Sequence, residues 1–321
     1  MEPQTVAEIL ASHAMWLDNP SEGMQANLKG ESLKGALLQG ARLTHAILSG
    51  AVLTGAQLNG ASLVVADLTR ANLERANLIS ADMQGAALNG ARFNDANLTN
   101  VTLTEASGVH TQFRRALLNQ ARLIDVDFQD AGFHDADLSE AQLPQARLYD
   151  ADFRGCRMHA TRFFHSRIHH TDMDGADLED ATFQGSRLDH VQFTSTNLAG
   201  VRFVRATITQ CNFRKARLQG ADFREARLRG GEFSGATLSG ARFGRSQLRL
   251  VDLRGANLEG ARGLSADQLL QSLTDETTIL PNGSRGPYAR FSGAEKPRLS
   301  GSIGEVFVED GSDVEDSPVD E

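Results

Sequence analysis

The segment AVLTGAQLNG, residues 51–60, contains two copies of the five-residue unit that decides the fold of this chain. Each copy begins with a small Ala and has a Leu at its third, central position. Every fifth residue from Leu28 to Leu258 is such a central position, and 46 of the 47 are Leu, Phe, Ile or Met. A period of five fits neither the 3.6-residue period of a helix nor the two-residue period of a strand. Fixed-period self-similarity instead predicts a solenoid.

Phenylalanine residues add a second period of twenty. Twelve of the 13 central Phe residues fall on two columns that are offset by ten residues. One column holds Phe93, Phe113, Phe133, Phe153, Phe193, Phe213 and Phe233, and the other holds Phe163, Phe183, Phe203, Phe223 and Phe243. Four units per turn predict a square coil in which equivalent residues stack at strand spacing, ~4.8 Å. The 47 units would make about twelve coils, with the central and small residues pointing inward.

One central position lacks a large side chain. Gly108 interrupts the row of Leu and Phe residues, and Thr111 stands nearby at a position that usually holds Ala. We expect a local void or a shifted backbone in this coil without a break in the register. An empty slot also predicts that Gly108→Leu stabilises the protein by ~1 kcal/mol.

The units carry a resemblance to a known family. Segments such as Ala66-Asp67-Leu68 and Ala71-Asn72-Leu73 resemble the pentapeptide-repeat proteins, and the likeness covers about three quarters of the chain. It implies an all-β solenoid, a right-handed quadrilateral parallel β-helix, which the two periods also indicate. The resemblance implies no particular function, because most members of that family have none assigned.

Both ends of the repeat carry helix signals. Thr5 and Glu8 form a capping box, so we expect an amphipathic helix over 5–17 that covers the first coil, with Trp16 packed at its edge. A second capping box begins at Ser265. The expected organisation is an N-terminal capping helix in 1–25, a β-helix in 26–262, a C-terminal cap in 263–281 and a disordered acidic tail in 282–321. From Glu305 onward the chain has eight acidic residues and no basic residue.

Charge is distributed unevenly along the chain. The formal net charge is −9, but residues 26–262 hold 28 basic and 25 acidic residues. Within them, 121–180 hold 13 acidic and 6 basic residues, whereas 181–262 hold 6 acidic and 14 basic residues. The net charge of the solenoid therefore changes from negative in 121–180 to positive in 181–262.

Arginine forms columns in the position just before the central residue. One face of the coil would carry Arg122, Arg162, Arg202, Arg242 and Arg262, and the adjoining face Arg147, Arg167, Arg187 and Arg227. Arg147, Arg167 and Arg187 would lie on three successive coils, where their like charges repel one another. We therefore weigh a docking stripe for a polyanion or acidic protein against an ordinary solvated, salt-bridged surface.

A second column suggests a metal site. Asp130, Asp150, His170 and His190 would point outward on four successive coils, close enough for two or three of them to share one cation. The alternative is a solvated column, and we expect no bound metal.

The sequence offers no further chemistry. It has no phosphate-binding loop, zinc-ligand spacing, nucleophile elbow or paired-carboxylate motif, so we expect no enzyme, no cofactor and no small-molecule substrate. Cys156 and Cys211 lie at small inward positions more than two coils apart, too far for a disulfide. We find no apolar run long enough for a membrane span and no secretory leader, which predicts a cytoplasmic protein, with secretion by a signal-peptide-independent route left open.

Three functions remain in view. The first is a non-catalytic, rod-like interaction scaffold that presents charged faces to a protein partner. The second follows from the fluoroquinolone-resistance branch of the family, whose members imitate duplex DNA and bind DNA gyrase. The third is a secreted bacterial effector or secretion accessory. Direct nucleic-acid binding is disfavoured, because no groove-entering or aromatic element accompanies the Arg residues. Neither the identity of the partner nor the oligomeric state follows from the sequence.

Overall fold

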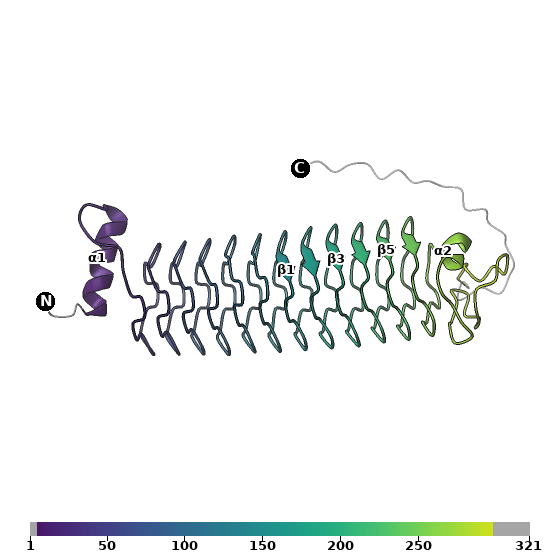
Figure 1. The fold of residues 1–321 in the computed structure, drawn as a ribbon, viewed down its shortest axis with the longest axis horizontal. Coiled ribbons are helices and arrows are strands. Elements are labelled where there is room, and N and C mark those ends of the chain that lie inside the picture. Colours follow the sequence, from purple (N-terminus) through teal and green to yellow (C-terminus); the bar gives the residue numbers. More distant parts are fainter. Residues whose placement is uncertain (1–4, 298–321) are drawn as a thin grey trace, which may run out of the picture.

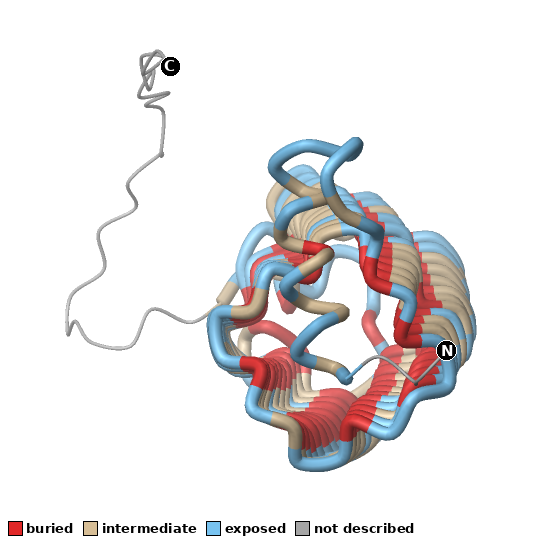
Figure 2. Tube along the Cα trace, turned by 90° about the vertical axis from the view of Figure 1, so that its left-hand side faces the viewer, coloured by how far each residue is buried: buried red, intermediate tan, exposed pale blue. Residues whose placement is uncertain are grey.

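The five-residue units wind into a four-sided rod with a short helix near each end (Figure 1). This computed structural model describes residues 5–297. Viewed along the rod, buried residues line the inside of each side and exposed residues lie at the corners and on the outer surface (Figure 2). The chain is thus a parallel β-solenoid, as the two sequence periods predict.

Each coil pairs with the next through parallel bridges between residues twenty apart. These bridges begin with Asn27 and Ile47 and continue to Arg242 and Arg262. The register does not slip at any point between them, which confirms the turn of four units. The side chain just before each central residue therefore stacks on its equivalents in the coils before and after it.

Regular strands occur on only one side of the rod. They are β1 (Arg147–Tyr149), β2 (Arg167–His169), β3 (Arg187–Asp189), β4 (Thr207–Thr209), β5 (Arg227–Arg229) and β6 (Gln247–Arg249). These six form one parallel sheet in chain order, with five pairings. Among the described residues, only six successive coils contain a regular strand. Elsewhere a turn follows each central residue so closely that only a single bridge fits.

The corners of the coil are tight turns in a left-handed conformation. In the unit that begins at Leu48, the Ala51 N–H donates to the Leu48 carbonyl at 3.0 Å, and Gly50 has a φ of 66°. A hydrogen bond from i+3 to i with a positive φ at i+2 is the pattern of a type II turn. Many corners hold other residues in the same conformation, such as Arg70 with a φ of 57°. The ladder thus enforces this geometry even where a side chain opposes it.

The core consists of the central and small residues stacked in columns. All but one of the 13 central Phe side chains are less than 2% exposed, and the last, Phe243, is 2% exposed. Stacked neighbours lie close and nearly parallel: the Phe133 and Phe153 rings have centroids 4.5 Å apart at an angle of 4°. Offset aromatic stacking adds to the apolar burial, so the Phe columns stiffen the rod from inside.

The coil at Gly108 contains no void at the central position, contrary to expectation. A Cβ placed on Gly108 would lie 2.5 Å from Cε1 of Phe128 and 2.6 Å from Oγ1 of Thr111. Phe128 is the one central Phe outside the two columns, and it stands one coil after Gly108. Its ring therefore fills the space that the glycine leaves. The predicted continuity of the register is confirmed, because Ser107 still pairs with Asp127.

The N-terminal end of the rod is covered by helix α1 (Val6–Asp18). Its capping box is formed as predicted, with Thr5 and Glu8 exchanging hydrogen bonds. His13 is completely buried, and the Ala26 N–H donates to its Nδ1 at 3.0 Å. Trp16 stacks on His13 with ring centroids 5.5 Å apart. A buried hydrogen bond thus ties the helix to the first coil.

At the C-terminal end, a short helix and two further bridges follow the last regular unit. Helix α2 (Ala266–Leu270) follows the last regular unit and has the predicted capping box at Ser265. The chain then adds two further parallel bridges, between Asp252 and Leu273 and between Asn257 and Ile279. These residues cover the open end of the last coil. Neither helix of the described segment has the length and apolar content needed to cross a lipid bilayer.

The structure differs from the sequence expectation beyond residue 281. Residues 282–297, expected to be disordered, fold back onto the C-terminal cap. Tyr288 is 8% exposed and Ala294 is 2% exposed, and the Tyr288 N–H donates to Oγ1 of Thr274 at 2.9 Å. The Tyr288 hydroxyl donates to Glu295 at 2.9 Å. A few apolar side chains and well-placed hydrogen bonds outweigh the Gly- and Ser-rich composition here. The rest of the expected tail, 298–321, lies outside the described residues.

Candidate functional site

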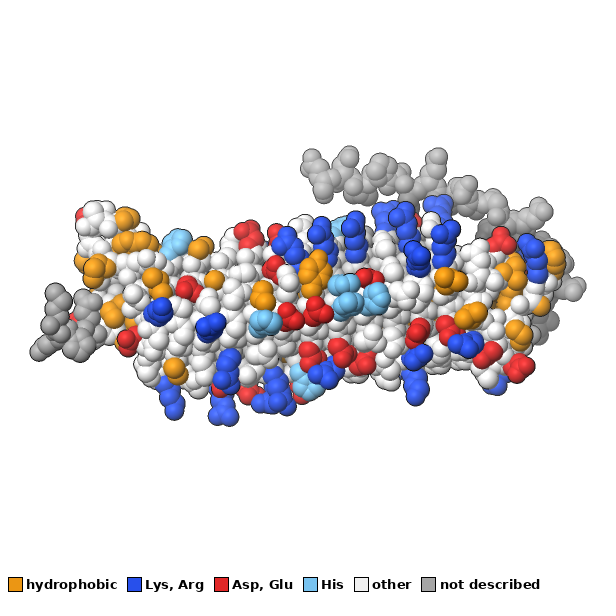
Figure 3. All heavy atoms as spheres, in the orientation of Figure 1, with side chains coloured by type: hydrophobic (Ala, Val, Ile, Leu, Met, Phe, Trp, Pro, Cys, Tyr) orange, Lys and Arg blue, Asp and Glu red, His pale blue; other side chains and the backbone are white. Residues whose placement is uncertain are grey.

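The sheet of β1 to β6 brings Arg side chains into direct succession. Arg147 pairs with Arg167, and Arg167 with Arg187, as register partners on neighbouring strands. Arg227 follows on β5, with Thr207 of β4 between it and Arg187. All four Arg residues are exposed, because the buried central residue of each strand turns its neighbours outward. We call these four residues the basic row. Figure 3 shows basic side chains gathered along the edge of the rod over these strands.

The basic row is nearly free of ion pairs. Arg147 lies 3.7 Å from Asp127, and no acidic group among residues 5–297 comes within 4 Å of the other three side chains. Some Arg residues elsewhere on the rod are paired closely, such as Arg115 with Asp95 at 2.7 Å and Arg205 with Glu225 at 2.8 Å. Others, such as Arg162 and Arg202, also have no acidic partner within 4 Å among the described residues. Among residues 5–297, the row is distinguished by three Arg residues that are register partners in direct succession.

The second predicted face is less continuous. Up to Arg242 its Arg residues alternate with Gln, Thr or Asp in the ladder, and only Arg242 and Arg262 are direct partners. The exposed members are Arg122, Arg162, Arg202, Arg242 and Arg262. Asp222 stands between Arg202 and Arg242, yet it pairs with Arg224 at 2.8 Å. Burial would raise the pKa of Asp222, but hydrogen bonds from Arg224 bring it below its usual value. The structure therefore does not join this second set into one row.

The sheet also contains basic residues that the sequence analysis missed. Arg229 and Arg249 are register partners on β5 and β6, and both are exposed. They line a surface hollow together with Gln271 and Leu250, and Leu250 is 75% exposed. They occupy the position just after the central residue, whereas the analysis followed only the position before it. Tracing this second column at a spacing of twenty would have found them.

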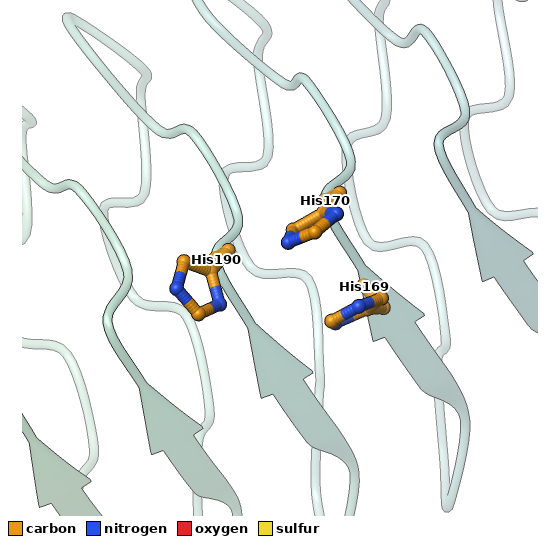
Figure 4. A group of neighbouring side chains, drawn as sticks. All are labelled: His169, His170 and His190. Atoms are coloured by element: carbon orange, nitrogen blue, oxygen red, sulfur yellow. The ribbon is translucent and has the colours of Figure 1, made fainter.

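The four residues of the predicted metal column do not come together as one group of ligands. Asp130 lies 3.8 Å from His110, and Asp150 lies 3.7 Å from His170, so each carboxylate faces a single imidazole. The structure instead brings His170 and His190 together with His169, which the column did not include (Figure 4). His169 ends strand β2 and precedes the corner, where the sequence period alone does not show that its ring turns toward the others.

Both cysteines are small core residues, as predicted. Each thiol is free and buried. The Cys156 thiol donates to the Phe133 carbonyl at 2.9 Å, and burial raises the pKa of both Cys156 and Cys211 to about 12. A thiol in this state is a poor nucleophile and a poor metal ligand.

Comparison with known proteins identifies the repeat. A family model described as pentapeptide repeats (8 copies) matches residues 25–63, 56–95, 66–104 and 96–132. A second model, of a pentapeptide repeat region, matches residues 126–203 and 176–262. No curated protein matches the chain.

Solved structures of pentapeptide repeat proteins are also similar. HetL, from the cyanobacterium Nostoc and involved in heterocyst differentiation regulation, is 26% identical over 88% of this chain and 100% of its own, with a TM-score of 0.39. QnrB1, a plasmid-mediated fluoroquinolone resistance protein, is 21% identical over 59% of this chain and 89% of its own, with a TM-score of 0.28. A protein of the Arabidopsis thaliana thylakoid lumen is 25% identical over 37% and 74% of the two chains, with a TM-score of 0.22. Because the two family models together match every unit from residue 25 to residue 262, the chain belongs to the pentapeptide repeat family.

Proposed function

We propose that the protein is a non-catalytic, rod-like scaffold that binds an acidic surface of a partner protein through its basic row. The observation that carries this proposal is the direct stacking of Arg147, Arg167 and Arg187 with almost no ion pairing. Stacked guanidinium groups at strand spacing repel each other by on the order of 1 kcal/mol per pair in water, and less in salt. A carboxylate from a partner would relieve this repulsion.

The chemistry of the row suits carboxylates. Arg presents a planar fork of donors that binds a carboxylate through two hydrogen bonds, which the point charge of Lys does not. The row also lies on a regular sheet whose backbone is fixed by the ladder of hydrogen bonds. Little backbone conformational entropy would therefore be lost on binding, which favours affinity. Arg229 and Arg249 extend the same surface toward the C-terminal cap.

Charge reversal within the row tests the proposal. The variant Arg167→Glu/Arg187→Glu/Arg227→Glu changes three exposed residues on one face of the rod. The matched control Arg115→Glu/Arg205→Glu/Arg214→Glu makes the same charge change at three ion-paired Arg residues in the corner turns of the coil, outside the strands. Partners captured from native cell extract by wild type and by both variants are then compared by quantitative mass spectrometry, and the best candidate is purified for direct titration.

The proposal expects an acidic partner that wild type and the control retain and the row variant loses. Its binding should weaken as salt rises, because exposed ion pairs are screened. Equal retention by all three proteins would refute the role of the row. Equal loss from both variants would show that net charge alone, rather than this face, decides binding.

A second candidate function rests on the acidic band of the rod. Residues 121–180 hold 13 acidic and 6 basic residues, and a DNA mimic that binds gyrase needs a sustained negative field. The next stretch, 181–262, holds 14 basic and 6 acidic residues, so the field reverses sign along the rod. We therefore expect purified protein to leave DNA supercoiling by gyrase unchanged at micromolar concentration. Potent inhibition in that assay would favour the mimic over the scaffold.

A further inference from the structure

We propose that His169, His170 and His190 form a surface site for a divalent transition-metal ion of the Zn²⁺ class. One nitrogen from each ring can be chosen so that all three lie within 4.8 Å of one another. His169 and His170 come from one coil and His190 from the next, and the three rings surround a common space (Figure 4). The site adjoins the basic row on β2 and β3, but none of its three imidazoles belongs to that row, so it does not depend on the proposed function.

The ladder of hydrogen bonds between coils fixes the backbone at the three histidines. His169 is the register partner of Asp189 on β3. His170 and His190 are the corner residues that follow, with nearly equal φ angles of 50° and 54°. Two imidazoles therefore lie at equivalent corners one coil apart, and the third comes from the position before the first of these corners. The His169 and His170 rings stack with centroids 3.9 Å apart, and the His190 ring meets His170 edge-on at 5.0 Å.

A carboxylate orients two of the rings. The two oxygens of Asp189 lie 2.9 Å from Nδ1 of His169 and 3.0 Å from Nδ1 of His190. The His190 contact has the geometry of a hydrogen bond, whereas the His169 contact is a close charge contact. When Nδ1 of each ring carries the proton, each Nε2 presents its lone pair. Asp150 lies 3.7 Å from Nδ1 of His170, which is too far for a direct hydrogen bond but adds a negative charge beside that ring. Metal-binding histidines are usually held by carboxylates in this manner, which raises their basicity and fixes the ring.

The donor set selects the kind of ion. Three neutral imidazoles suit Zn²⁺, Cu²⁺ or Ni²⁺, whereas Mg²⁺ and Ca²⁺ prefer oxygen ligands. Zinc needs nitrogens ~2.0–2.1 Å from the ion, which places them about 3.4 Å from one another in a tetrahedral site. The His169 and His170 rings must turn out of their stacked arrangement for their in-plane lone pairs to meet at one ion. The side chains of His169, His170 and His190 are 40%, 50% and 50% exposed, which leaves room for this rotation. Solvent exposure also leaves the fourth position to water.

Neighbouring charges both oppose and support a cation here. Arg167 and Arg187 line the same surface hollow as His169 and Asp189, and their charges disfavour a divalent ion. Asp189 and Asp150 offset them. Neither Arg residue pairs with Asp189 within the described segment, so this carboxylate remains engaged with the imidazoles.

Isothermal titration of the full-length, untagged protein with ZnCl₂ tests the site. We expect saturable binding of one ion, and an affinity at least tenfold lower in His169→Ala and in His190→Ala. The control is His110→Ala. His110 is an exposed histidine at an equivalent corner and also lies near a carboxylate, that of Asp130. Asp189→Asn keeps all three ligands but should weaken binding by about 10–100-fold, because the carboxylate no longer fixes the rings.

Absorption spectra of the Co²⁺ form provide a second readout. A three-histidine, tetrahedral site gives intense visible bands, which should vanish in His169→Ala and persist in His110→Ala. Circular dichroism checks that each variant is folded, and these exposed positions leave the core untouched. No saturable binding to wild type, or equal affinity in wild type, His169→Ala and His190→Ala, would overturn the proposal. An equal loss in His110→Ala would overturn it as well, since binding would then be nonspecific.

Discussion

At the scale of single residues, Gly108 and Phe128 behave as a complementary pair. The Phe128 ring occupies the space next to Gly108, and a Cβ there would approach Cε1 to 2.5 Å. Overpacking of this kind typically costs about 1–3 kcal/mol. We therefore expect Gly108→Ala and Gly108→Leu to lower the melting temperature, the reverse of what an empty slot predicts.

A double-mutant cycle isolates the pair. Phe128→Leu alone should also destabilise, because it leaves part of the slot empty. Combined with Gly108→Leu, the new leucine restores the pattern of the other coils, so the double variant should be more stable than the sum of the single changes predicts. Chemical denaturation of the four proteins measures the coupling. Additive changes would mean that the two positions are independent.

At the scale of elements, the N-terminal cap contains a pH-sensitive contact. Burial lowers the pKa of His13 below its usual value, and its Nδ1 accepts the Ala26 N–H only in the neutral form. The unfolded state therefore binds a proton that the docked helix excludes. The contribution of this contact to stability is complete above about pH 6.5 and is lost as the pH falls below that value. Fluorescence of Trp16, the only tryptophan, should report undocking on acidification.

The variant His13→Asn serves as the control for this prediction. An Asn side chain still offers an oxygen to the Ala26 N–H but does not titrate. Its melting temperature and Trp16 emission should change less than those of wild type between neutral and mildly acidic pH. Parallel changes in both proteins would show that other groups cause the acid sensitivity.

The C-terminal cap depends on one carboxylate. Asp275 accepts hydrogen bonds from the Thr277 hydroxyl at 2.7 Å and from the backbone N–H groups of Thr277, Thr278 and Gly255. The hydrogen bond from Thr277 is the main cause that lowers the pKa of Asp275 to about 2. A depressed carboxyl pKa stabilises the fold above the unfolded value of about 4, and this stabilisation is lost as the pH falls toward 2.

Asp275→Asn should accordingly lower the melting temperature at neutral pH. The difference from wild type should shrink as the pH is lowered from about 4 to about 2, since both proteins are then uncharged at this position. Thermal melts across that range measure it. Glu276→Gln removes the neighbouring charge and should have little effect. A deficit that stays constant with pH would mean that geometry, and not charge, makes the Asp275 contacts stabilising.

At the scale of the whole molecule, the sequence predicts more of the fold than of the site. Periods of five and twenty determine the core columns and the register, because each coil contacts only its neighbours. They do not determine how exposed side chains turn. The rings of His169 and His170 meet although the period places them at different positions, and Asp222 pairs with Arg224 instead of the Arg residues beside it in the ladder. Phe128 filling the space beside Gly108 is also a matter of three-dimensional packing.

The twenty-residue period makes a register test of the basic surface possible. Residues 191–200 contain no charged residue and lie between Arg187 and Arg227. Inserting one extra copy after Gly200 would rotate the following coils by half a turn and move Arg227, Arg229 and Arg249 to the opposite side of the rod. Inserting two copies would add one complete coil and keep all of them on one face. Because the two Phe columns are offset by ten, Phe stacks on Phe in both insertions.

The two insertions carry the same charge and repeat the same core residues. They differ in length by one ten-residue copy and in the face that the downstream Arg residues occupy. Retention on a heparin column serves as the probe for a polyanion. We expect the two-copy protein to elute at the same salt concentration as wild type and the one-copy protein to elute earlier, because half of its basic surface points away. Circular dichroism and melting curves should show both to be folded. Identical elution of all three proteins would mean that Arg147, Arg167 and Arg187 do not act together with the Arg residues of β5 and β6 as one surface.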